Sequence, residues 1–180
     1  TPVAESDASF DIVVRRYAGG YFSDKFAQLQ VGEAMAFKGP EPTLPYAPNA
    51  FETVAFVCGG TGAAPAVQLL RAALADDTDT TRFRVLYLSR TKRDQTLKRD
   101  LDSLKCDRLD LFYACDDVDG LVDANLLRRC LPAPSDTKSA VLVSGPPGLV
   151  RRLCGTTDKR EPLGGLLREM GYGAQVARLD

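Results

Sequence analysis

Apolar and polar residues recur along the chain with two different periods, and the change from one period to the other separates strands from helices. After residue 52, short apolar runs alternate with segments in which leucine and valine return every three or four residues. We expect strands over 53–58, 84–89, 109–114, 140–144 and 174–179, and helices over 65–75, 94–104, 123–130, 147–154 and 163–170. This alternation predicts an α/β fold: a parallel, Rossmann-like sheet with helices on both faces.

A proline-rich stretch separates this regular part from a shorter amino-terminal segment. Four prolines lie between Pro40 and Pro48, and so many prolines exclude regular helix or central strand, so we interpret about 39–52 as a linker. Before it, the pattern predicts strands over 10–17 and 34–38 and a short helix that is capped by Ser23 and ends near Gly32. Such a segment cannot close a sheet alone, and we expect a partial domain with its linker over 1–52 and a second domain over 53–180.

Composition narrows the possible functions. Lys and Arg total 23 against 24 Asp and Glu, and the two signs are interspersed, so we expect no nucleic-acid partner. No apolar run approaches the about 20 residues of a membrane helix, and the first residues do not resemble a secretory signal. The five cysteines form no CxxC pair, which favours a reducing compartment over a disulfide framework. Without histidine, we expect no metal site and a cofactor that supplies any chemistry.

Two glycine-containing turns follow predicted strands and carry the candidate binding chemistry. The first has Gly59, Gly60, Thr61, Gly62 and Pro65 between a strand and a helix. Glycines let backbone N–H groups approach an anion, and the helix terminus adds partial positive charge, so this turn predicts a pyrophosphate site. It lacks the Lys-Ser/Thr ending of a P-loop, which argues against triphosphate hydrolysis. The second turn, Ser144, Gly145, Pro146 and Pro147, ends another strand and should lie on the same rim of the sheet.

These turns, together with Gly19-Gly20-Tyr21-Phe22-Ser23, resemble the NADH-cytochrome b5 reductase branch of the ferredoxin-NADP reductase superfamily, with matching order and spacing along most of the chain. The resemblance implies a fragment of an antiparallel flavin-binding β-barrel over 1–52 and an NAD(P)H-binding domain over 53–180. It also implies hydride transfer from NADH to FAD and electron transfer to a haem protein such as cytochrome b5. The sequence departs from the family at Ser144, where a cysteine is usual beside the nicotinamide, at Ala63-Ala64 instead of Ile-Thr, and at a carboxyl end without an aromatic residue.

The resemblance also assigns roles to residues of the amino-terminal segment. Thr1 and Pro2 would end the flavin motif, with Thr1 approaching the isoalloxazine and, with Ser144, belonging to the catalytic site. The segment Gly19, Gly20, Tyr21, Phe22 and Ser23 would receive the FAD pyrophosphate, and Arg15 would lie near bound nucleotide. Because the flavin arginine of the family lies outside the sequence, we expect this chain by itself to bind FAD weakly or not at all.

The nucleotide preference depends on residues after the second and third strands of the regular part. The resemblance places Asp116 where an acidic residue accepts from a ribose hydroxyl and repels a 2′-phosphate, which favours NADH. Against it stands the basic stretch Ser89-Arg90-Thr91-Lys92-Arg93, which could hold the 2′-phosphate of NADPH or could simply face water.

Two other readings stay open. One is a nucleotide-binding or partner-docking module without redox activity. The other is an NADPH-dependent reductase with another acceptor, such as a quinone or an iron–sulfur protein. For either reductase we expect a monomer in the cytoplasm or on the cytosolic face of a membrane, touching the membrane only through residues before Thr1.

Overall fold

Five parallel strands form the centre of the larger part of the chain. The computed structural model describes residues 10–38 and 46–179, and the chain divides into two units, Thr1–Pro45 and Tyr46–Asp180. The strands of the second unit are β1 (Thr53–Gly59), β2 (Arg82–Ser89), β3 (Leu109–Cys115), β4 (Ser139–Ser144) and β5 (Val176–Arg178). They lie in the order β3-β2-β1-β4-β5, and every neighbouring pair is parallel. The chain runs from β1 to β3 on one side and then crosses to β4, so a topological switch point lies between β1 and β4.

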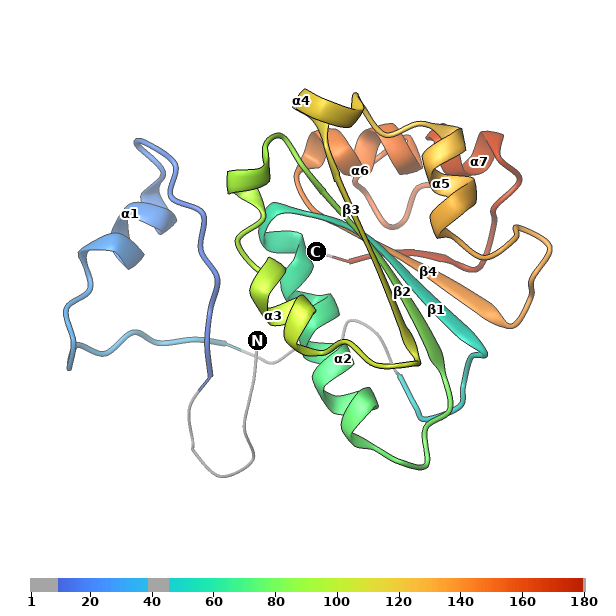
Figure 1. Cartoon of the computed structure of the whole chain (residues 1–180). Coiled ribbons are helices and arrows are strands. Elements are labelled where there is room, and N and C mark those ends of the chain that lie inside the picture. Colours follow the sequence, from blue (N-terminus) through green and yellow to red (C-terminus); the bar gives the residue numbers. More distant parts are fainter. Residues whose placement is uncertain (1–9, 39–45, 180) are drawn as a thin grey trace. The chain divides into compact units, whose positions relative to one another are not determined.

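Helices cover both faces of this sheet (Figure 1). The helices of the second unit are α2 (Ala64–Ala75), α3 (Lys98–Ser103), α4 (Asp116–Asp119), α5 (Ala124–Cys130), α6 (Pro147–Cys154) and α7 (Gly165–Glu169). Helices α2 and α3 lie on one face, and α5, α6 and α7 lie on the other. The predicted fold class, a parallel Rossmann-like sheet between helices, is confirmed. Within residues 10–38 and 46–179, no helix has the length and apolarity that a bilayer crossing requires.

The strands are buried on both faces, which explains their continuous apolar sequences. In β1, Ala55 and Val57 join a core cluster with side chains of α5, α6 and α7, and Phe56 points to the opposite face. Burial of one such side chain contributes about 1.5–3 kcal/mol relative to exposure. Packing on both faces holds the sheet in place, so the positions at which its strands end are fixed.

The helix expected over 94–104 is shorter in the structure, where α3 covers only Lys98–Ser103 and a separate 3-10 turn precedes it. A 3-10 turn, Lys92–Asp94, is closed by a capping box between Thr91 and Asp94. Gln95 then leaves the helical region and buries its side chain, whose amide lies 3.4 Å from the sulfur of Cys115. This buried amide interrupts the helical pattern, and α3 starts only at Lys98.

A network at the amino-terminal end of the sheet fixes the point where the second unit begins. The carboxylate of Asp79, 2% exposed, accepts hydrogen bonds from the Tyr46 hydroxyl at 2.5 Å and from the backbone of Asn49 and Thr81. Burial of the phenol, and its hydrogen bond to Asp79, raise the pKa of Tyr46 to about 12. Burial opposes ionisation of Asp79, but these hydrogen bonds outweigh it and hold the pKa of Asp79 below its usual value.

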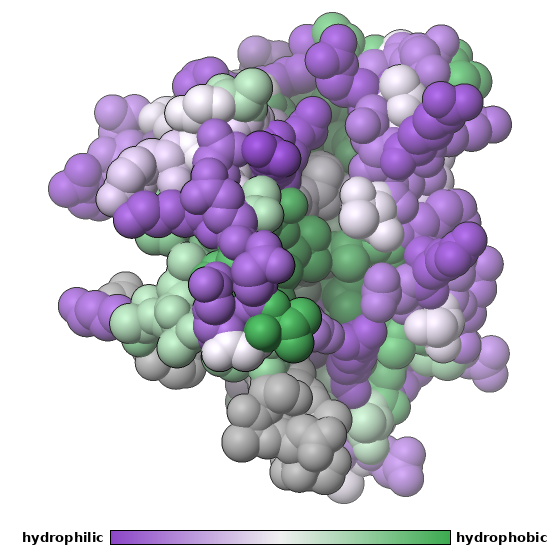
Figure 2. Space-filling view, turned by 90° about the vertical axis from the view of Figure 1, so that its left-hand side faces the viewer, coloured by the Kyte–Doolittle hydropathy of each residue, from purple (hydrophilic) through white to green (hydrophobic). Residues whose placement is uncertain are grey.

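In the first unit the structure describes one helix, α1 (Tyr21–Gln28), among residues 10–38. The strands predicted over 10–17 and 34–38 are wrong, because neither segment forms a backbone ladder with another described segment. Phe10 and Phe37 nevertheless meet edge to face, with ring centroids 5.5 Å apart. Large apolar side chains of this unit are exposed, Tyr21 at 73% and Phe22 at 69% among them. Figure 2, which views the molecule from the left-hand side of Figure 1, shows green apolar atoms open on the surface among purple polar ones.

Candidate nucleotide-binding site

The two glycine-containing turns lie against each other on one rim of the sheet. Strands β1 and β4 are paired so that Cys58 lies opposite Ser144, and both strands end at about this level of the sheet. A Cβ atom added to Gly62 would lie 2.6 Å from the backbone Cα of Gly145, so only glycine permits this approach. The sequence prediction that both turns share one rim is confirmed. Their role in nucleotide binding stays a prediction.

The first turn leads into α2 with a backbone suited to an anion. Gly60 has a φ of +55°, in the left-handed region that favours glycine, and begins a 3-10 turn over Gly60–Ala63. Helix α2 has twelve residues, Pro65 in its first turn and no side-chain cap at Ala63. The N–H of Ala64 already donates to the carbonyl of Thr61 and Pro65 has none, but the helix dipole still favours a negative charge at this end. This arrangement can bind a phosphate or pyrophosphate at the switch point.

A second part of the rim joins the ends of β2 and β3. Asp116 is exposed at the start of α4, and the backbone N–H of Asp117 donates to the carbonyl of Arg90 at 3.2 Å. The carboxylate of Asp119 accepts from the backbone N–H of Cys115 at 2.8 Å, which fixes the turn. The structure thus brings the acidic Asp116 and the basic stretch after β2 to one corner, with Arg90, Lys92 and Arg93 exposed.

Ser144 and Cys58 lie buried beneath the rim, and the catalytic role expected of Ser144 stays a prediction. Ser144 is 2% exposed at the end of β4. Cys58 is fully buried opposite it, and burial raises the pKa of the Cys58 thiol to about 12, so this cysteine is a core residue and not a nucleophile.

Sequence reasoning missed one residue of this rim, Tyr87. Its side chain is fully buried in β2, and its hydroxyl donates to the carbonyl of Gly60 at 3.1 Å. Tyr87 lies in the strand expected over 84–89, and no local motif distinguishes a tyrosine that bonds a loop from one that only packs.

The candidate flavin residues lie in the first unit. Gly20 is the N-cap of α1, so the predicted cap at Ser23 is wrong: its hydroxyl lies inside the helix, accepts from the Tyr17 backbone N–H and bonds the Gly20 carbonyl. Gly19 has a φ of +74°, which shapes the turn before the helix. Arg15 is exposed, with its guanidinium 5.8 Å from the ring centre of Tyr17. Thr1 and Pro2 lie outside the described residues.

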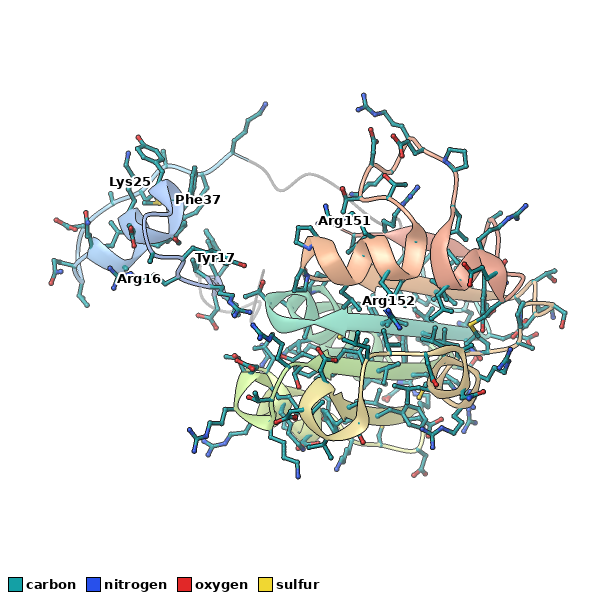
Figure 3. The ribbon with its side chains drawn as sticks, turned by 90° about the horizontal axis from the view of Figure 1, so that it is seen from above. Arg16, Tyr17, Lys25, Phe37, Arg151 and Arg152 are labelled. Carbon is teal, nitrogen blue, oxygen red and sulfur yellow. The ribbon has the colours of Figure 1, made fainter. Side chains whose placement is uncertain are left out.

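Figure 3 shows where the basic side chains of each unit originate: Arg16 and Lys25 in the first unit, and Arg151 and Arg152 on α6 in the second. Arg16 pairs with Asp24 at 2.9 Å, and Lys25 lies 4.3 Å from the ring centre of Tyr21. Arg152 donates to the carbonyl of Val122 at 2.9 Å, so it braces a loop as well as facing solvent. Exposed pairs of this kind contribute less than about 1 kcal/mol of stability.

The fold and the rim together define a class of protein: an α/β domain that offers a glycine turn and a helix N-terminus at a topological switch point. Residues 56–155 match the family described as oxidoreductase NAD-binding domain, and residues 1–46 match the oxidoreductase FAD-binding domain. The chain belongs to the oxidoreductase NAD-binding domain family. The resemblance found in the sequence is confirmed.

Individual relatives agree with this assignment. The chain is 35% identical over 188 residues to NADH-cytochrome b5 reductase 2 of Meyerozyma guilliermondii, covering 96% of this chain and 63% of the relative. It is 30% identical to an NADH-cytochrome b5 reductase-like protein of Arabidopsis thaliana, covering 98% and 58%. The chain thus spans less than two thirds of the length of these curated relatives.

A solved structure shows the same fold. The cytochrome b5 reductase domain of Ulva prolifera nitrate reductase superposes with a TM-score of 0.76 at 24% identity, covering 89% of this chain and 66% of that one.

Proposed function

We propose that this chain is the nucleotide-binding part of a flavoprotein reductase that passes hydride from NADH to FAD and then electrons to a haem protein such as cytochrome b5. The observation that carries the proposal is the close approach of Gly62 to Gly145, which joins two glycine turns at the switch point of the sheet. The names of the relatives and the two matched families support the same reaction.

In this proposal the residues of the rim hold the nucleotide, and the hydride passes from NADH to FAD without being carried by a side chain. Backbone N–H groups of Gly60 to Gly62 and the first turn of α2 bind the pyrophosphate. Asp116 accepts from a hydroxyl of the adenine ribose. Ser144, at the end of β4, lies beside the nicotinamide and limits its position through contact. FAD, when bound, accepts two electrons at once and releases them singly, so one NADH reduces two haem acceptors.

The first unit would bind FAD through Gly19 to Ser23 and the basic side chain of Arg15. The N-terminus of α1, with Gly20 as its cap and no side-chain hydrogen bond there, leaves backbone N–H groups that suit a pyrophosphate. Exposed Tyr21 and Phe22 offer apolar surface for an aromatic ring system.

The test is anaerobic rapid mixing of NADH with a longer, flavin-containing protein that includes this chain, followed through the visible absorbance of the flavin. The proposal expects complete reduction by NADH and then reduction of cytochrome b5 at two haems per NADH. Flavin that NADH leaves oxidised would refute the reductase, and a nucleotide-binding module without redox activity would give that result.

A second candidate function is the same reaction with NADPH in place of NADH. The exposed side chains of Arg90, Lys92 and Arg93 lie at the same corner as Asp116 and could pair with a 2′-phosphate. Comparison of flavin reduction rates with NADH and NADPH at equal concentration distinguishes the two. We propose that the protein lies in the cytoplasm or on the cytosolic face of a membrane, because its five cysteines include no CxxC pair and so favour a reducing compartment. We also propose that it is a monomer.

A further inference from the structure

The hydroxyl of Tyr87 holds the glycine turn that follows β1 through one hydrogen bond. Tyr87 belongs to β2 and points to the face covered by α2 and α3, where it is fully buried. Its hydroxyl donates to the carbonyl of Gly60 at 3.1 Å, in the turn that follows β1. A tyrosine hydroxyl carries one proton, so this bond uses its entire donor capacity.

Burial raises the pKa of Tyr87, and the backbone of Leu97 and Thr96 opposes that rise. The phenol therefore keeps its proton at neutral pH and stays available as a donor to Gly60. Thr96 and Leu97 follow the capping box of Thr91 and Asp94 and directly precede α3.

The surroundings of Tyr87 fix its position. Gly59 and Leu88 are paired between β1 and β2, so the strand that carries Tyr87 is held beside the start of the glycine turn. The ring of Tyr87 lies near that of Tyr113 in β3, with centroids 6.4 Å apart. Gly60 has a left-handed backbone, and the space beside its Cα is open, since a Cβ there would meet nothing within 4 Å. The bond from Tyr87 restrains the orientation of the Gly60 carbonyl.

We propose that Tyr87 is a positioning residue for the nucleotide: its hydroxyl holds the glycine turn in a fixed orientation before the ligand binds. This inference rests on the proposed function, in which the pyrophosphate contacts that turn. A ligand that carries a pyrophosphate gains from the restraint, because it need not order the turn itself. A ligand without phosphate gains much less.

The test compares Tyr87→Phe with Tyr113→Phe. Tyr113 is a matched control, because it also loses a hydroxyl from the same face, and its hydroxyl donates at 2.9 Å to Asp102 on α3 and not to the glycine turn. Calorimetry measures the Kd of ADP-ribose, which carries a pyrophosphate, and of adenosine, which carries no phosphate. Loss of one hydrogen bond in a rigid site predicts that Tyr87→Phe binds ADP-ribose about tenfold more weakly and adenosine about as well as before. Tyr113→Phe should leave both values unchanged.

A second readout needs no ligand. Hydrogen exchange in the unliganded protein should become faster at residues 60–64 in Tyr87→Phe and stay unchanged there in Tyr113→Phe. Unchanged exchange in Tyr87→Phe, or equal loss of ADP-ribose affinity in both variants, would overturn the role of Tyr87 while leaving the proposed function intact. A wild-type chain that binds neither ADP-ribose nor NADH would refute the proposed function and the nucleotide role of Tyr87 with it.

Discussion

Replacement of Gly62 by alanine is the sharpest perturbation of the candidate site that the backbone allows. The added Cβ would lie 2.6 Å from the Cα and N of Gly145 and from the carbonyl carbon of Ser144. Carbon atoms in contact normally lie about 3.5–4.0 Å apart, so the overlap is roughly 1 Å. All three atoms belong to the backbone, and no side chain can rotate away to relieve the contact.

The free energy of unfolding should therefore fall. Overpacking of a close-packed site costs about 1–3 kcal/mol. Replacing glycine by alanine also restricts the unfolded chain and returns about 0.4–1 kcal/mol. We expect a net loss of about 1–2 kcal/mol, together with a weaker Kd for NADH, because relief of the overlap must move the two turns apart.

Urea unfolding followed by far-ultraviolet circular dichroism measures the loss of stability, since the sequence contains no tryptophan to serve as a fluorescent probe. Gly148→Ala is the matched control: it lies in α6, a Cβ there meets nothing within 4 Å, and alanine favours the helix by up to about 1 kcal/mol. If Gly62→Ala proved as stable as wild type and bound NADH equally well, the contact between the two turns would be wrong.

Three further predictions concern charge and reactivity. Because the folded pKa of Asp79 lies below its unfolded value of about 3.9, its contribution to stability is complete above that pH and disappears as the pH falls through the folded pKa. Acid titration should thus show a shallower decline in stability for Asp79→Asn than for wild type. Asp116→Ser should shift the ratio of NADH to NADPH affinity by about tenfold toward NADPH, measured by calorimetry, since it removes one charge that repels a 2′-phosphate. A thiol reagent should modify Cys106 rapidly in the native protein and Cys58 only after unfolding, because Cys106 is exposed and Cys58 is buried; rapid native labelling of Cys58 would contradict its place in the core.

Much of the second unit could be predicted from the sequence, because buried parallel strands and the helices between them have distinct periods. The helix expected over 147–154 has those bounds in α6, and the strand expected over 109–114 extends one residue further in β3. The same rules failed where a buried polar side chain redirects the backbone, as Gln95 does before α3. They also failed over 10–17, where an apolar pattern lacks a neighbouring strand among the described residues.

The candidate site could also be predicted only in part. Glycine spacing located the turns at Gly62 and Gly145, because only glycine tolerates such close backbone approach. The hydrogen bond from Tyr87 to Gly60 could not be predicted, since it depends on which loop lies above one side chain of a strand. Contacts between segments distant in sequence leave no periodic pattern.

Calorimetric titration of the chain with NADH and NADPH tests the central claim most directly. The account predicts saturable binding of NADH at one site per chain, with a lower Kd than for NADPH and with competition by ADP-ribose. Binding of neither nucleotide by the folded chain would contradict it.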